Sequence, residues 1–123
     1  MPKKILIIED EVAMAKMYRD KFQKAGYKVF LALTSEEGIE LAGKEKPDLI
    51  VLDILLPTEN GISFLGKLRK APELKDLKVV ALSNYDEPKT KQEARNLGVK
   101  EYLIKTDYTP KDLVLRVKGY LKK

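Results

Sequence analysis

The chain has 123 residues, of which 44% are hydrophobic and 35% are charged, and its net charge is +5; this composition predicts one soluble globular domain over residues 1–123. The absence of cysteine and histidine excludes disulfides, thiolate and imidazole metal ligands, and any role as a phosphohistidine donor. No apolar run approaches the ~20 residues of a membrane span, and the N-terminus is too polar for a signal peptide, so we expect a cytoplasmic protein without a membrane partner.

Five short apolar runs have the length and composition of buried strands. They alternate with segments of helical periodicity, which is typical of βα units that build a parallel sheet. The predicted strands cover residues 3–8, 27–33, 48–52, 78–82 and 101–104.

The first two helices have recognisable ends. Apolar residues recur at helical spacing from Ala15 to Ala25, and Gly26 is a plausible stop. A capping box, Thr34 to Glu37, begins the second helix, which we expect to run to about Lys46.

The remaining helices follow the third, fourth and fifth strands. The third covers 61–70. For the fourth we expect Asp86 as the N-cap, Leu97 near the end and Gly98 as the stop. For the last we expect Thr109 as the N-cap and Pro110 at the first helical position.

Right-handed crossovers leave few ways to arrange five such βα units. The flavodoxin-like (βα)5 fold, a doubly wound five-stranded parallel sheet of order 2-1-3-4-5, places the first and third strands side by side. That order brings Glu9 and Asp10 against Asp53.

Polar residues end four of the predicted strands, and these ends share one edge of the sheet. Three carboxylates there, from Glu9, Asp10 and Asp53, call for a cation, and Mg²⁺ is the usual one where phosphate is handled. An aspartate can act as a nucleophile, while Lys105 and the Ser83 hydroxyl can stabilise a phosphoryl group.

Each residue taken alone has a structural interpretation. The acids at 9–11 would suit the start of a helix, Ser83 a turn, and Lys105 the surface. Their occurrence together at four strand ends favours phosphoryl transfer. A flavin carrier of this fold would need a phosphate-binding loop where the acids stand, and an aspartate-dependent phosphohydrolase would need an acid at Leu55.

The chain resembles bacterial response regulator receiver domains over essentially its whole length. The matching segments are Ile7-Ile8-Glu9-Asp10-Glu11, Leu52-Asp53-Ile54-Leu55-Leu56-Pro57 with Gly61, Leu82-Ser83-Asn84 and Tyr102-Leu103-Ile104-Lys105.

This resemblance implies that Asp53 accepts a phosphoryl group from a phosphohistidine. It implies that Mg²⁺ binds to Asp10 directly, to Glu9 through water, to Asp53 and to the backbone carbonyl of Leu55. Ser83 and Lys105 would hold the phosphoryl oxygens, and Ser83 would act as a switch together with Tyr102.

Three positions modify this expectation. Receivers usually have a proline after the lysine, in a cis peptide, whereas Thr106 follows Lys105 here, so we expect a trans bond. Leu55 and Tyr85 would flank the path of an attacking water, and neither can orient it, so we expect slow dephosphorylation.

We therefore interpret the chain as a phosphorylation-dependent signalling switch and not as a metabolic enzyme. The expected partners are a sensor histidine kinase or phosphotransfer protein, and a downstream output protein or a second copy. Nucleic acid is not expected, because the basic residues are spread along the chain. A degenerate receiver used only for docking is the alternative. A stand-alone regulator and a fragment of a longer one would both have this sequence.

Overall fold

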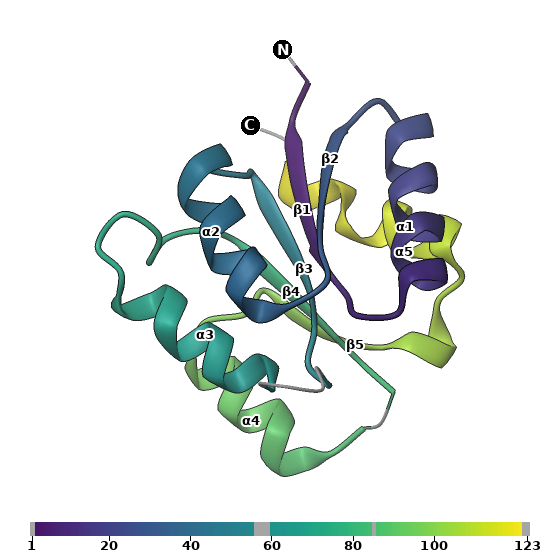
Figure 1. Cartoon of the computed structure of the whole chain (residues 1–123). Helices are drawn as coiled ribbons and strands as arrows, with labels where there is room; N and C mark the ends of the chain where they lie inside the picture. Colours follow the sequence, from purple (N-terminus) through teal and green to yellow (C-terminus); the bar gives the residue numbers. More distant parts are fainter. Residues whose placement is uncertain (1, 56–59, 85, 122–123) are drawn as a thin grey trace.

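The computed structural model describes residues 2–55, 60–84 and 86–121. One parallel sheet of strand order β2-β1-β3-β4-β5 forms its centre (Figure 1). The predicted flavodoxin-like order is therefore confirmed, and each predicted strand end lies within one residue of the observed end. The strands are β1 Lys4–Ile8, β2 Lys28–Ala32, β3 Leu49–Asp53, β4 Val79–Ser83 and β5 Glu101–Ile104.

Helices cover both faces of this sheet in an unequal division, with α1 and α5 on one face and α2, α3 and α4 on the other (Figure 1). None of the helices in residues 2–55, 60–84 and 86–121 has the length and apolar composition of a membrane span. The α-helices are α1 Val12–Lys24, α2 Ser35–Glu45, α3 Gly61–Lys70, α4 Pro88–Asn96 and α5 Pro110–Val117, with 3-10 turns at Lys105–Asp107 and Lys118–Leu121.

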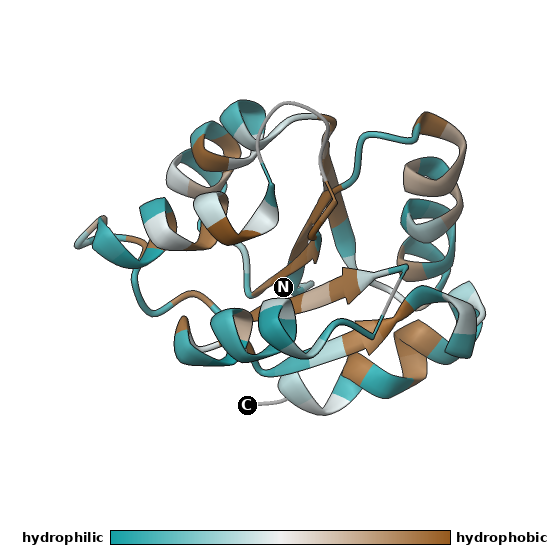
Figure 2. Cartoon of the chain, turned by 90° about the horizontal axis from the view of Figure 1, so that it is seen from below, coloured by the Kyte–Doolittle hydropathy of each residue, from teal (hydrophilic) through white to brown (hydrophobic). Residues whose placement is uncertain are grey.

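Two apolar cores form because successive strand residues point to opposite faces. In β1, Leu6 and Ile8 pack in the core beneath α2, α3 and α4, whereas Ile5 and Ile7 pack in the core beneath α1 and α5. The strands are consequently apolar on both faces, while the helices also carry hydrophilic segments (Figure 2).

Helix ends follow the residues that the sequence offers. Gly26 and Gly98 have φ angles of +98° and +81°, so both act as the predicted helix stops. Thr34 accepts a hydrogen bond from the Glu37 N–H at 3.1 Å, and the Glu37 carboxylate accepts one from the Leu33 N–H at 3.3 Å. The predicted N-terminus of α2 is therefore confirmed.

The predicted N-cap of α4 is wrong. Glu87, not Asp86, occupies that position, and Pro88 is the first helical residue. Proline favours an extended residue before it and lacks the N–H that would be unsatisfied in the first turn, so it sets the start of the helix. Asp86 instead forms an ion pair with Lys91 at 3.6 Å.

The chain returns tightly from β3 to α3. The Gly61 N–H donates to the Ile54 carbonyl at 2.7 Å, and a Cβ atom at position 61 would lie 2.8 Å from the Ile54 Cα. Only glycine allows this approach, which fixes the first turn of α3 beside the end of β3.

Arg69 connects the far end of α3 to two neighbouring segments. Its guanidinium donates to the carbonyls of Leu97 at 2.7 Å, Lys75 at 2.8 Å and Leu77 at 2.7 Å. A fourth bond, at 3.3 Å, reaches the carbonyl of Gly98. Arg69 therefore holds the C-terminal end of α4 against the entry to β4.

We expect Arg69→Met to lower the free energy of unfolding by about 2 kcal/mol, because hydrogen bonds to a charged group are lost and their carbonyls lose a partner. Urea denaturation would measure this change. Lys70→Met, at the exposed neighbouring position, is the matched control and should change it by less than about 0.5 kcal/mol. Equal effects of the two substitutions would contradict the structural role of Arg69.

Candidate functional site

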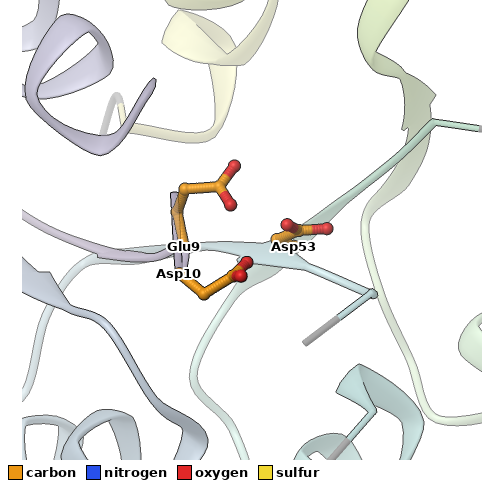
Figure 3. Close-up of side chains that lie close together, drawn as sticks. All are labelled: Glu9, Asp10 and Asp53. Atoms are coloured by element: carbon orange, nitrogen blue, oxygen red, sulfur yellow. The ribbon is translucent and has the colours of Figure 1, made fainter. Parts of the chain in front are cut away.

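Three carboxylates meet where β1 and β3 end. The two strands pair in parallel with Ile8 opposite Leu52, so the residues that follow, Glu9 and Asp53, emerge side by side. One oxygen from each of Glu9, Asp10 and Asp53 lies within 4.8 Å of the others (Figure 3). Glu9 and Asp53 are 2% and 4% exposed, so the two charges are placed where solvent screens them little.

Lys105, the residue that follows β5, supplies the opposite charge from the other side of β4. Its Nζ lies 2.8 Å from Glu9 Oε1 and 3.1 Å from Asp53 Oδ2. A single ammonium therefore connects the ends of three strands, and the two most buried acids of the site are paired in the manner that buried charges require.

The electrostatic effects on Glu9 and Lys105 are mutual. Burial raises the pKa of Glu9, a hydrogen bond with Asp53 raises it further, and Lys105 opposes both effects. Burial lowers the pKa of Lys105, but its bonds and charge interactions with Glu9 and Asp53 outweigh burial, so the pKa is raised overall. Lys105 is therefore held in its charged form beside the two acids.

The helix-capping interpretation of the acids at 9–11 does not explain this arrangement. Glu11 is the N-cap of α1, yet its side chain forms no capping hydrogen bond. Its backbone N–H instead donates to Glu9 Oε2 at 3.3 Å. The start of α1 thus helps to orient Glu9 toward Lys105.

The loop after β3 contributes a backbone donor. The Leu55 N–H donates to Asp53 Oδ1 at 3.0 Å, while the Leu55 side chain is 45% exposed. Participation of the Leu55 carbonyl in metal binding stays a prediction. Leu56, Pro57 and Tyr85, which belong to the predicted motif and water path, lie outside the described residues.

The two predicted switch residues lie on adjacent strands. Ser83, the last residue of β4, is 3% exposed and pairs in the sheet with Ile104. Tyr102 is 9% exposed, and its hydroxyl has no hydrogen-bond partner in the parts of the chain that the structure describes. Both residues line one cavity, which is consistent with movements of one affecting the other.

The peptide bond after Lys105 is trans, as predicted from Thr106, and the described residues contain no cis peptide bond. A 3-10 turn over Lys105–Asp107 carries the chain toward α5. The substitution of the usual proline therefore leaves the Lys105 ammonium in contact with both acids.

Tyr18 lies on the buried face of α1, between Ala15 and Phe22. Burial raises its pKa, and Lys105, Glu9 and Asp53 also act on it, so the phenol lies within the electrostatic field of the site. Helical spacing alone gives no signal for this proximity, because a tyrosine on an apolar stripe is typical of a core.

The acidic group fits a hard divalent cation. Its carboxylate oxygens are close enough to share one ion, and oxygen ligands are those that Mg²⁺ prefers. The Lys105 ammonium already satisfies part of the negative charge, so an ion would add to this compensation rather than replace it.

A family model for the response regulator receiver domain matches residues 5–118. The chain belongs to this family. Receiver domains are signalling domains and not classical enzymes, so the arrangement of acids, lysine and serine lies in a domain used for two-component signalling.

Curated relatives of this receiver domain include two kinds of protein. The chain is 34% identical to the alkaline phosphatase synthesis transcriptional regulatory protein PhoP of Bacillus subtilis, covering all of the chain and 50% of that protein. It is 30% identical to the polar-differentiation response regulator DivK of Brucella anthropi, over 98% of each. The chain thus spans about half of the first relative and nearly all of the second.

Solved structures share the fold of this receiver domain. The chemotaxis response regulator CheY4 of Vibrio cholerae superposes with a TM-score of 0.89 at 26% identity, covering 98% of this chain and 100% of that one. A response regulator from Chloroflexus aurantiacus has a TM-score of 0.88 at 31% identity, with full coverage of both chains.

Proposed function

We propose that this receiver domain is a phosphorylation-dependent signalling switch and that Asp53 is its phosphoacceptor. The observation that carries the proposal is the buried Asp53 carboxylate at the end of β3, held by Lys105 at 3.1 Å and by the Leu55 N–H at 3.0 Å. A carboxylate that is fixed and paired in this way can attack phosphorus without reorganisation of its surroundings.

In this reaction an Asp53 oxygen forms a bond to phosphorus, and the bond between phosphorus and the donor breaks, so the donor leaves with that electron pair. Charge develops on the phosphoryl oxygens during the transfer. Lys105 and the Ser83 hydroxyl are placed at neighbouring strand ends to stabilise that charge. Leu55 offers no group that orients water, which favours slow hydrolysis of the product.

Mg²⁺ would bind to Glu9, Asp10 and Asp53, with the Leu55 carbonyl as a further ligand, and would supply positive charge against the transferring group. We expect Mg²⁺ at ten times its dissociation constant to raise the free energy of unfolding by about 1.4 kcal/mol, because it binds the folded acids only. Thermal denaturation with and without EDTA would measure this.

Asp10→Asn should remove most of the stabilisation by Mg²⁺, because it deletes one charge of the group and leaves the Lys105 contacts intact. Asp20→Asn, an exposed acid of α1, is the matched control and should retain the effect. Stabilisation of equal size in Asp10→Asn would contradict the assigned site.

The proposed phosphodonor is a sensor histidine kinase or a phosphotransfer protein, because the chain belongs to the receiver domain family of two-component signalling. The proposed readout is the face formed by α4, β5 and α5, where an output protein or a second copy would bind. Among the residues of α4 only Ala94 is buried, so this helix is weakly anchored and suited to shift when Ser83 and Tyr102 change position.

Incubation with acetyl phosphate and Mg²⁺ tests the proposal directly. The intact mass should rise by one phosphoryl group. Amide exchange should change most over residues 83–84 and 86–108. A chain that stays unlabelled under conditions that label another receiver domain would instead support the alternative, a docking module that signals without phosphorylation.

A further inference from the structure

A cavity of about 240 Å³ opens beside the phosphorylation site, between the N-terminal ends of α3 and α4. Its apolar wall includes Leu55 after β3 and Ile62 in α3. Its other wall carries Glu87, the N-cap of α4, and Glu93 in the second turn of that helix. Ser83 and Tyr102 also line it, so the cavity adjoins the two proposed switch residues.

The charge of this cavity is opposite to that of the chain. Two carboxylates line it and, among the described residues, no lysine or arginine does, although the net charge of the chain is +5. Glu87 accepts a hydrogen bond from the Thr90 hydroxyl, and neither Glu87 nor Glu93 forms an ion pair with another described residue. The cavity therefore offers acceptors to a cation.

A second observation independently indicates a missing partner. Tyr102 is more than nine-tenths buried, lines this cavity, and has a hydroxyl without a hydrogen-bond partner among the described residues. A buried polar group without a partner costs about 1–3 kcal/mol, and buried hydroxyls of tyrosine usually find one. The hydroxyl oxygen is itself buried, so a donor in the cavity can bond to it only when the Tyr102 side chain moves.

We propose that this cavity binds an arginine side chain of a partner protein. A guanidinium has five N–H donors and no acceptor, which matches the two carboxylates that line the cavity. The apolar stem of arginine would lie against Leu55 and Ile62 while its charged end reaches Glu87 and Glu93. Lysine matches less well, because its ammonium is a compact point charge that cannot spread over these separated acceptors.

Phosphorylation would control this binding, a part of the inference that rests on the proposed function. Movement of Ser83 and Tyr102 changes two walls of the cavity, so the affinity for arginine differs between the two states of the domain. By linkage, a bound arginine favours one phosphorylation state by the same factor.

The test is a titration of the isotope-labelled full chain with the peptide acetyl-Gly-Arg-Gly-amide, followed by NMR chemical shifts. The matched probe carries citrulline in place of arginine, which keeps the shape and removes the charge. We expect saturable shifts that concentrate at residues 60–62, 87–93 and 102 with arginine and not with citrulline. Equal shifts with both peptides would overturn the proposal.

Variants then locate the site. The double substitution Glu87→Gln and Glu93→Gln should weaken binding of the arginine peptide about tenfold or more, because charge-assisted hydrogen bonds are lost. Tyr102→Phe, which keeps the ring, should weaken it less. Glu36→Gln, an exposed acid in the first turn of α2, is the control and should bind normally. Unchanged affinity in the double variant would refute the site.

Asp53→Asn separates this inference from the proposed function. The arginine peptide should bind the unphosphorylated variant as it binds the unphosphorylated parent, since Asp53 does not line the cavity. Binding at the cavity without any labelling of Asp53 would support the pocket and reject the phosphoacceptor. Labelling of Asp53 without arginine binding would do the reverse.

Discussion

Replacing Asp53 with asparagine should abolish phosphoryl incorporation from acetyl phosphate. The amide cannot act as the nucleophile, and no other described carboxylate is in the same position, at the end of a strand and bonded to both Lys105 and the Leu55 N–H. The variant should fold, because Lys105 keeps its 2.8 Å contact with Glu9. Intact-mass measurement after incubation with donor and Mg²⁺ checks the result.

Asp107→Asn serves as the control for the loss of one acid, since Asp107 is exposed in the turn after β5. It should be labelled to the same extent as the parent. A phosphoryl group that persists on the Asp53→Asn variant would show that another residue is the acceptor, and peptide mapping would identify it.

Replacing Lys105 with methionine should have the largest effect on stability. The substitution leaves Glu9 and Asp53 together without their cation, and removal of one partner from a buried ion pair typically costs 3–5 kcal/mol. Because the Lys105 side chain is still 12% exposed, we expect about 3 kcal/mol in EDTA at neutral pH. Chemical denaturation would measure the loss, and phosphoryl incorporation should also fall.

Two further variants give this prediction its controls. Lys111→Met, at an exposed position of α5, should leave stability nearly unchanged. Glu9→Gln combined with Lys105→Met should recover part of the lost stability, because one uncompensated charge is then absent. A combined variant less stable than Lys105→Met alone would mean that repulsion between the acids is not the cause.

The pH dependence follows from the directions of the two shifts. The pKa of Lys105 is raised on folding, so its stabilisation is complete below its usual value of 10.5 and is lost as pH rises through the folded pKa. The pKa of Glu9 is also raised, so its ionisation disfavours the folded state. Stability should therefore fall as pH rises from 4.5 through the folded pKa of Glu9, and more steeply in Lys105→Met.

The fold, and which residues form the acidic group, could be predicted from the sequence alone. Apolar runs of strand length alternate with helical segments, and parallel strands necessarily bring their C-terminal ends to one edge of the sheet. Glu9, Asp53 and Ser83 could therefore be placed together from their positions after β1, within β3 and within β4. Gly26 and Gly98 marked helix ends because their backbone angles are those that glycine favours.

The contacts among these residues follow from the packing of the strands and helices, which the sequence does not show. The ammonium of Lys105 bonds Glu9 as well as Asp53, and the order of these residues along the chain does not specify this pairing. No local sequence pattern predicts that Tyr18 lies near the acids. None predicts the cavity lined by Glu87, Glu93 and Tyr102. The physical reason is that periodicity and turn residues report neighbours along the chain, whereas side-chain contacts between separate strands and helices depend on how those elements pack.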